Sequence, residues 1–559
     1  MSAPIDVKLV GKECKFAVHL PAKEGLREDC HFIKETLHYS DGTKKPNFIR
    51  VLNFKRPFYI TKKHFRKYND KKEYESLDKL NRHLATQSDL PKEVGKQLGS
   101  YRWKSFTNRD VKTSKDAQYV YGTDVTSTVI LKSIYKKKWD LISDSKLAVL
   151  DIETDIDTDE IKLITVATYD KVFTVINRRL TNKLNMSDAD LYKKLKKMYK
   201  EFIPESMIKE MLKSNRDMIV DDELGCIAES FKELNDWMPD IVAIWNLNFD
   251  IPRIMERLAK YDVNPKDILT DLRVPKEYRF FKYVKGKESK LMASGKFGTL
   301  PPQKQWHHAI GSMSFQLLDA MSSYNYIREG QPEVIGGYGL DNILKKNTKH
   351  QKLKLETNTR FQNADWHKMM VDKHPLEYTI YNKWDCMGML ELDMKTGDLA
   401  RQISIFSGIN DLGYFNSGPT KIATNLYFEY LKYGVVIGTG GKKQDEEEDE
   451  RMSLSNWIAV LDAYRIIPDG LKIILEDEDL MTNIYAFVYD IDAVSSYPSN
   501  IRAANVSKAT RITEVIKIEG IEVEEMKMVN INLISGPSNA LGYTNIMFGI
   551  PDLDYWDDI

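Results

Sequence analysis

Four carboxylates lie in or beside apolar segments of this chain, in an order that suits phosphate chemistry. Asp151 and Glu153 are two residues apart in one apolar run, Asp250 follows a second run, and Asp385 lies in a third segment. Burying a charge in apolar surroundings is costly unless something pairs with it, and divalent cations can pair with such acids. The set therefore predicts a metal site.

Two-metal hydrolysis of a phosphodiester is the chemistry that such a site would perform. Several carboxylates hold two cations about 4 Å apart; one cation activates water and the other stabilises the leaving oxygen. Mg²⁺ prefers hard oxygen ligands, so two Mg²⁺ (or Mn²⁺) ions per site are the expected cofactors. Tyr381 lies four residues before Asp385 and shares its helix face, where its hydroxyl can orient the attacking water. The alternative for Tyr381 is a packing role.

Strands alternating with helices around these acids predict an α/β layer structure. Short continuous apolar runs predict buried strands, and these cover residues 147–152, 161–169, 171–176, 240–246 and 313–319. Helical spacing predicts helices over 191–202, 252–258, 377–394, 399–409 and 419–433. Asp151 and Glu153 are expected to point to the same side of their strand, because side chains alternate along a strand.

Composition narrows the class of protein without naming it. A chain of 559 residues needs several domains, and 42% hydrophobic with 29% charged residues is ordinary for a globular protein. The 82 basic and 82 acidic side chains balance, which gives no support for a nucleic-acid binder but leaves room for a local basic channel. The N-terminus is no signal peptide, and no segment has the roughly 20 apolar residues that span a bilayer.

The four cysteines favour a reducing interior over secretion. They are scattered and none has CxxC spacing, so neither a zinc site nor a disulfide framework is expected; they are Cys14, Cys30, Cys226 and Cys386. The expected location is intracellular, in the cytoplasm of a host cell or a replication compartment within it, with no membrane partner.

Together, the acidic motifs resemble the DEDD-type 3′–5′ exonuclease domain, in its tyrosine form, of family B DNA polymerases. The residues that carry the resemblance are Asp-x-Glu at 151–153, Asn-x-x-Phe-Asp at 246–250 and Tyr-x-x-x-Asp at 381–385. The resemblance implies a ribonuclease-H-like domain, a mixed sheet with flanking helices. It also implies that the acids are metal ligands and that Tyr381 is the water-orienting group; the ligands are Asp151, Glu153, Asp250 and Asp385.

One departure from the family concerns the middle motif. Replicative family B enzymes usually have one more residue between the Asn and the Phe/Tyr-Asp, and the shorter form here is similar to that of stand-alone proofreading exonucleases. This leaves the DNA-binding role of Asn246 open but not the metal role of Asp250. Phe249 is a candidate for stacking on unpaired bases.

A second resemblance lies downstream, at residues 492–499. Asp-Ala-Val-Ser-Ser-Tyr-Pro-Ser is similar to motif A of family B polymerases, with Ser496 in place of the usual Leu. The resemblance implies that Asp492 binds metal in the palm and, with Ser495 and Ser496, contacts the nucleotide. Tyr497 would stack under the incoming sugar and exclude a ribose 2′-hydroxyl. The alternative is a strand and a Pro turn, with Tyr497 in a core.

Two motifs that family B synthesis requires do not occur in this sequence. These are Lys-x-x-x-Asn-Ser-x-Tyr-Gly of the fingers and Tyr-x-Asp-Thr-Asp-Ser, which supplies the second palm carboxylate. One palm carboxylate cannot hold two metals, so the chain is not expected to polymerise alone. It resembles the N-terminal subunit of a split polymerase, completed by a C-terminal chain with fingers, the rest of the palm and thumb. The alternatives are a stand-alone exonuclease with a vestigial palm and a non-catalytic DNA-binding scaffold.

The expected domain organisation follows from these motifs. Residues 1–143 form an N-terminal domain, on which 395–440 can pack, and 144–394 form the exonuclease domain. Residues 395–480 form a helical connection with an acidic loop at 445–450, and 481–559 begin the palm. Expected partners are primer-template and single-stranded DNA, the C-terminal polymerase chain and, as a further candidate, a sliding clamp.

Overall fold

The computed structural model describes most of the chain up to residue 440. The described residues are 7–23, 27–69, 71–203, 214–291, 296–329, 331–332, 334–348, 350, 353 and 364–440. By its contacts the chain separates into Met1–Gly441, which holds every described residue, and Lys442–Ile559. The predicted palm residues Asp492, Ser495, Ser496 and Tyr497, and the acidic loop 445–450, lie outside the described residues.

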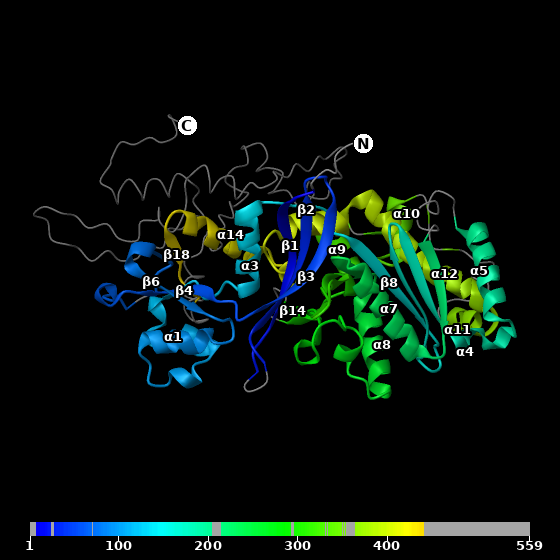
Figure 1. Cartoon of the computed structure of the whole chain (residues 1–559), viewed down its shortest axis with the longest axis horizontal. Coiled ribbons are helices and arrows are strands. Elements are labelled where there is room, and N and C mark those ends of the chain that lie inside the picture. The colour runs from blue at the N-terminus through cyan, green and yellow to red at the C-terminus, as the bar shows by residue number, and fades with distance from the viewer. Residues whose placement is uncertain are drawn as a thin grey trace, which may run out of the picture. The chain divides into compact units, whose positions relative to one another are not determined.

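A mixed eight-stranded sheet has the strand order β11-β10-β9-β8-β12-β17-β16-β13. Figure 1 labels β8 of this sheet, with helices α7, α8 and α12 near it. Its strands are β8 (Leu147–Thr154), β9 (Ile161–Thr168), β10 (Lys171–Asn177), β11 (Asn215–Val220), β12 (Ile241–Ile244), β13 (Phe281–Val284), β16 (His308–Gly311) and β17 (Gln316–Asp319). β9 is antiparallel to β8 and β10, whereas β12 is parallel to β8 and β17. The strands predicted in this region are present, and the α/β class is confirmed.

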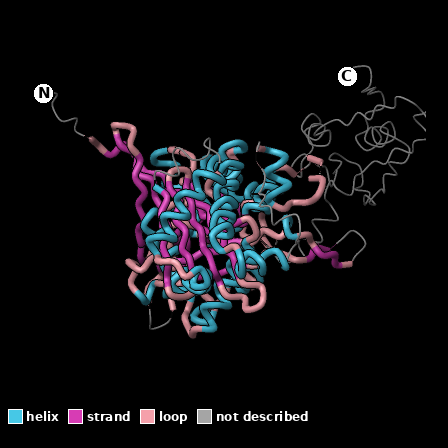
Figure 2. The backbone as a smooth tube through the Cα atoms, turned by 90° about the vertical axis from the view of Figure 1, so that its right-hand side faces the viewer, coloured by secondary structure: helices cyan, strands magenta, loops and turns pink. Residues whose placement is uncertain are grey.

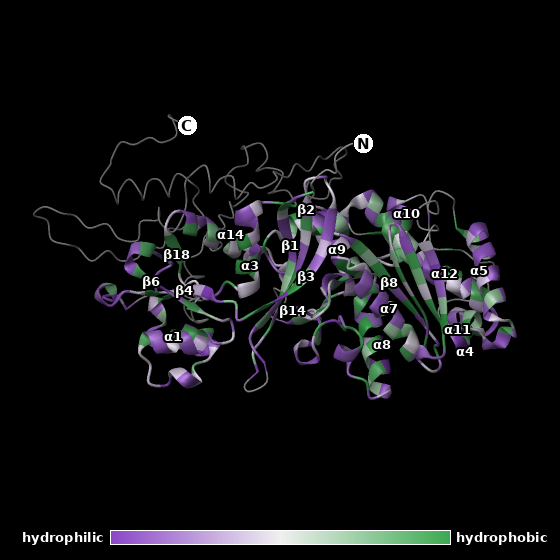
Figure 3. Ribbon diagram, in the orientation of Figure 1, coloured by the Kyte–Doolittle hydropathy of each residue, from purple (hydrophilic) through white to green (hydrophobic). Residues whose placement is uncertain are grey.

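Helices pack on both faces of this sheet and so bury its strands on both sides (Figure 2). One face packs against α5 (Asp188–Phe202), α9 (Ala320–Ile327), α10 (Leu340–Asn347), α11 (Ala364–Lys373) and α12 (Pro375–Thr396). The other face packs against α7 (Glu223–Trp237) and α8 (Leu247–Lys260). Figure 3 shows the contrast between the apolar strand β8 and the hydrophilic helix α5 at the edge of the layer.

The described N-terminal region includes two three-stranded sheets and three α-helices. β1 (Leu9–Leu20), β2 (Cys30–Tyr39) and β3 (Lys44–Leu52) form a meander, and β4 (Arg56–Thr61), β6 (Leu80–Ala85) and β7 (Val120–Tyr121) form the second sheet. The helices are α1 (Leu90–Leu98), α2 (Asn108–Thr113) and α3 (Ser127–Trp139). The buried Lys34 ties the meander to the central sheet region, since its Nζ donates to the carbonyls of Met238 at 2.7 Å and Ser314 at 3.0 Å.

Residues after α12 return to the N-terminal region. β18 (Val435–Ile437) pairs with β5 (Tyr74–Ser76), and α14 (Gly418–Lys432) leads into it. Tyr427 and Val436 share a buried cluster with Tyr59 and Tyr121. Residues far apart in the sequence therefore build one core here.

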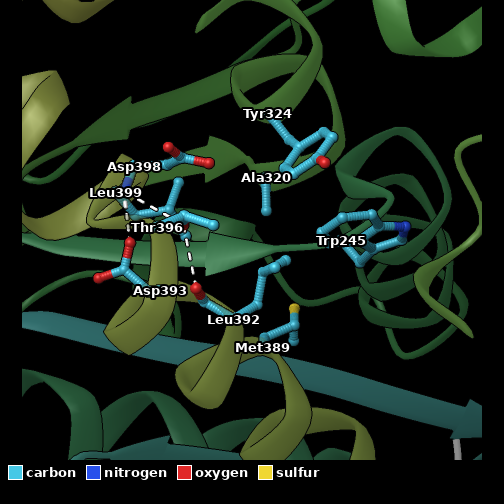
Figure 4. Close-up of a pocket in the computed structure, with 9 residues that line it drawn as sticks. All are labelled: Trp245, Ala320, Tyr324, Met389, Leu392, Asp393, Thr396, Asp398 and Leu399. Carbon is cyan, nitrogen blue, oxygen red and sulfur yellow. Dashed lines mark hydrogen bonds between the residues drawn. The ribbon is translucent and has the colours of Figure 1, made fainter. Parts of the chain in front are cut away.

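The helix predicted over 399–409 is present, but its first part is π-helical and it ends two residues earlier than predicted. A π-helical turn covers Asp398–Gln402, and α13 covers only Ile403–Ser407. Gly397 ends α12 at φ 65°, and the Asp393 carboxylate accepts a hydrogen bond from Leu399 N at 2.6 Å (Figure 4). The small cavity in Figure 4 lies beside this turn, at the C-terminal end of α12 and two helical turns beyond Asp385. No helix among the described residues has the length and apolarity needed to cross a membrane.

Candidate metal centre between the sheet and helix α12

Strand β8 presents Asp151 and Glu153 to the face of the sheet that α12 covers. Leu147 and Val149 belong to the core on that side, whereas Leu150 belongs to the core on the other side. Side chains alternate along a strand, so the odd-numbered acids continue the α12 face. The prediction that both acids point the same way is confirmed by their joint position in one acidic group.

Three carboxylates meet where β8 faces α12. One oxygen from each of Asp151, Glu153 and Asp385 lies within 4.8 Å of the others, so the group can hold a metal ion. Glu153 is 7% exposed and Asp385 3%, while Asp151 is partly exposed. Three carboxylates this close and this buried repel one another, and a divalent cation bound between them would offset that repulsion.

Helix α12 contributes hydrogen-bond donors to the two strand acids as well as the third acid. Asn382 Nδ2 donates to Asp151 Oδ2 at 2.8 Å, and the Tyr378 hydroxyl donates to Glu153 Oε2 at 2.6 Å. Residues 378, 382 and 385 are four and three apart, so they share one helix face. Each acid of Asp-x-Glu therefore has its own donor on the helix that carries Asp385.

An aromatic group borders the acids, built from α11 and α12. His367 Nδ1 lies 2.7 Å from the Tyr378 hydroxyl oxygen and 3.5 Å from Glu153 Oε2. The ring of Trp366 lies 4.8 Å from that of Tyr381 and 5.9 Å from that of Tyr378, between centroids. Tyr381 is 8% exposed, so it takes part in packing at the site, and its proposed contact with water stays a prediction.

Sequence reasoning missed Tyr378, Asn382 and His367. Tyr378 and Asn382 lie seven and three residues before Asp385, and this spacing places them on the same helix face as Asp385. Helical spacing could therefore have identified both as candidates. His367 had no such signal, because its position depends on how α11 packs on α12.

Asp250 lies beside this group without joining the close set of three. The helix predicted to start at Pro252 starts at Leu247, which places Asp250 in the first turn of α8, 5% exposed. Burial raises the pKa of the Cys386 thiol, and the carboxylates of Asp151, Asp385 and Asp250 raise it further. The charge of Asp250 therefore acts on the same small region as the other acids.

The two residues predicted to contact DNA lie at the surface next to Asp250. Phe249 is 46% exposed, with the Arg253 guanidinium 5.7 Å from its ring centroid. Asn246 is exposed and precedes the first turn of α8, where its carbonyl accepts from Phe249 N at 2.9 Å. An exposed aromatic ring with a nearby cation suits base stacking, a role that stays a prediction.

A further buried acid, Asp319, ends β17 and caps α9. Its Oδ1 accepts from Ser322 N at 2.7 Å, whereas its Oδ2 is buried with no hydrogen-bond partner among the described residues. Burial raises the pKa of this carboxyl from 3.8 to about 7. Between these two values the unfolded chain has lost the proton that the folded chain keeps, so the folded state loses stability as pH rises.

We expect the Asp319 carboxyl to lower the free energy of unfolding by up to about 4 kcal/mol as the pH rises from 4 to 8, at about 1.4 kcal/mol per pKa unit. The Asp319→Asn variant has no charge to bury and keeps an oxygen for Ser322 N. Urea unfolding at pH 5 and pH 8 is expected to show a smaller stability loss in the variant than in the unaltered protein. An equal loss in both proteins would show that Asp319 is ionised in the folded state.

Comparisons with known proteins add no assignment to this geometry. No protein-family model and no curated protein matches the chain. The case for a function therefore rests on the residues of the site.

Proposed function

We propose that this chain is a two-metal 3′–5′ exonuclease acting on DNA, and that it is the N-terminal part of a family B DNA polymerase. The observation that carries the proposal is the convergence of Asp151, Glu153 and Asp385 between β8 and α12. These residues come from two motifs more than 200 residues apart, and the third motif supplies Asp250 beside them.

The sheet supports the ribonuclease-H-like fold that the resemblance implies. In the run β10-β9-β8-β12-β17, β9 alone is antiparallel to its neighbours. β8 lies in the middle of this run, and α12 crosses its face. The acids are therefore carried by β8, by the start of α8 and by α12, which are the elements that the proposed domain requires.

The donor set suits Mg²⁺ or Mn²⁺, because all of the proposed ligands are carboxylate oxygens. Bound metal would supply the activated water and stabilise the leaving oxygen of the phosphodiester. Asp151, Glu153 and Asp385 would hold the cations, with Asp250 as the fourth ligand, and Tyr381 would orient the water. Phe249 stacks on an unpaired base at the 3′ end of the strand. The free energy needed to unpair that base is lower at a mismatched terminus than at a paired one, so mismatched ends reach the site more readily.

A single-stranded oligonucleotide labelled at its 5′ end tests the exonuclease. With Mg²⁺ the unaltered chain is expected to produce a ladder that shortens from the 3′ end, and EDTA stops it. The Asp385→Asn variant, purified in the same way, is the control for contaminating nucleases. Absence of digestion with both Mg²⁺ and Mn²⁺ would contradict the proposal and favour a DNA-binding scaffold.

The polymerase part of the proposal rests on the motif at Asp492, Ser495, Ser496 and Tyr497, by resemblance alone. The chain alone is expected to extend no primer. A second chain that carries fingers, the remaining palm carboxylate and thumb is expected to restore extension on mixing. If digestion occurs but no such chain restores synthesis, the chain is a stand-alone exonuclease with a vestigial palm.

A further inference from the structure

We propose that Tyr378 and His367 are positioning residues that together fix the Glu153 carboxylate for metal binding. The proposal rests on the exonuclease function proposed above and deepens it. None of the motifs assigned to that function includes either residue. The pair bridges α11 and α12 and ends on β8, so it joins three elements at one acid.

Burial decides that Tyr378 acts through Glu153 rather than on a substrate. Its side chain is fully buried, with the rings of Trp366, His367 and Tyr381 around it. Its hydroxyl lies 2.6 Å from Glu153 Oε2 and 2.7 Å from His367 Nδ1. A group enclosed in this way cannot touch DNA, and its polar contacts are directed at the acid and the imidazole.

The proton inventory fixes the direction of both hydrogen bonds. A tyrosine hydroxyl has one proton to donate, and an ionised carboxylate can only accept, so Tyr378 donates to Glu153. The Tyr378 oxygen then accepts from His367, which must carry its proton on Nδ1. In this arrangement both donors are used, and Glu153 Oε2 is held in one direction.

A fixed carboxylate matters because metal ligands are oriented by the groups that bind them. Loss of such a supporting hydrogen bond typically lowers metal affinity or activity 10- to 100-fold. Asp151 has its own donor, Asn382, whereas Glu153 depends on Tyr378 for a hydrogen bond from α12. Removal of the Tyr378 hydroxyl is therefore expected to act on metal affinity through Glu153.

Calorimetric titration of Mn²⁺ into the full chain, without DNA, tests the pair independently of activity. Tyr378→Phe keeps the ring and removes the hydroxyl, and it is expected to weaken Mn²⁺ binding about 10-fold or more. Tyr135→Phe is the matched control, because the Tyr135 hydroxyl also donates to a buried carboxylate, that of Glu35, in the N-terminal region. The control is expected to bind Mn²⁺ as the unaltered chain does.

Variants of His367 separate positioning from simple packing. His367→Asn can supply an amide N–H near the place of Nδ1 and is expected to keep Mn²⁺ affinity within a few fold. His367→Leu fills similar space without a donor and is expected to approach Tyr378→Phe. Equal affinity in the Asn and Leu variants would show that the ring only packs, and would overturn the role of His367.

The outcomes distinguish this proposal from the proposed function. Wild-type Mn²⁺ affinity in Tyr378→Phe overturns the positioning role, whether or not the unaltered chain digests DNA. Mn²⁺ binding that depends on Tyr378, in a chain that digests no DNA, supports the positioning role and contradicts the exonuclease. If Tyr378→Phe fails to fold, the two His367 variants decide the question alone.

Discussion

The double variant Asp151→Ala, Glu153→Ala is expected to lose Mg²⁺-dependent digestion of single-stranded DNA by at least about 1,000-fold. The variant removes two of the three carboxylates that lie within 4.8 Å of one another. A metal supplies several kcal/mol of stabilisation to the transition state, and about 1.4 kcal/mol corresponds to a tenfold change in rate. The measurement is the rate of 3′-end shortening at saturating enzyme.

DNA binding and folding are expected to survive this change. Removing the two acids relieves their mutual repulsion, which opposes the cost of leaving the Tyr378 hydroxyl and the Asn382 amide without these acceptors, so a small net change in the stability of the metal-free fold is expected. Fluorescence anisotropy of a labelled oligonucleotide measures binding, and thermal unfolding measures the fold. Parallel loss of digestion and binding would indicate a damaged DNA site instead of a damaged metal site.

A matched control is available in the turn that follows β8. Asp157 and Asp159 are also two acids separated by one residue, but Asp157 is exposed, Asp159 is partly exposed, and they pair with Lys368 and Arg253. Exposed ion pairs contribute little to stability, and Asn tolerates the φ of 58° at position 159, so Asp157→Asn, Asp159→Asn removes the same charge with little structural effect. This control is expected to digest DNA at close to the unaltered rate.

Local pattern was enough to predict the elements that carry the site. The apolar runs of β8, β9 and β10 are short and continuous, and period-two alternation put Asp151 and Glu153 on one face. The helix predicted over 377–394 is α12, Pro375–Thr396, longer by two residues at each end. These features depend on residues close in sequence, which is why a single sequence contains them.

Contacts between distant segments could not be read in this way. Glu153 and Tyr378 are separated by 225 positions, and their hydrogen bond depends on α12 crossing β8 in one register. The helix predicted from residue 399 begins instead with a π-helical turn, Asp398–Gln402, where the Asp393 carboxylate accepts from the backbone N–H of Leu399. Tertiary packing decides such features, whereas propensity only biases them.

The acids of this chain belong to two proposed sites with different reactions. Asp151, Glu153, Asp250 and Asp385 all lie within residues 144–394, and the proposed function assigns hydrolysis to them. Asp492 belongs to a second predicted site, whose partner carboxylate is expected on another chain. Removal of nucleotides is therefore the activity expected of this chain alone, and addition of nucleotides the activity expected of the assembly.

The orientation of α12 itself depends on a buried ion pair, and breaking it is the largest stability effect that we expect. Lys383 is fully buried; its Nζ donates to Asp217 Oδ1 at 2.8 Å and to Asn215, and lies 4.1 Å from the Tyr199 ring centroid. Burial lowers the pKa of this lysine, and the Asp217 carboxylate opposes that shift. The pair joins α12 to β11 on the side of the helix away from Tyr378 and Asn382.

Lys383→Met is expected to lower the free energy of unfolding by about 3–5 kcal/mol, because it leaves the buried Asp217 carboxylate without its cation. The Lys383→Met, Asp217→Asn double variant removes both charges and is expected to recover much of that loss, since Tyr199 can still donate to the Asn oxygen. Urea unfolding followed by tryptophan fluorescence measures all three proteins. Lys432→Met, which breaks an exposed pair with Glu429, is the control and is expected to change little.

Metal affinity connects this ion pair to the site. Asp385, Tyr378 and Asn382 reach the β8 acids from one face of α12, so a helix released from β11 holds them less firmly. Mn²⁺ binding is therefore expected to weaken in Lys383→Met and to recover in the double variant, in step with stability. A Lys383→Met protein that unfolds like Lys432→Met would show that apolar packing alone sets the position of α12.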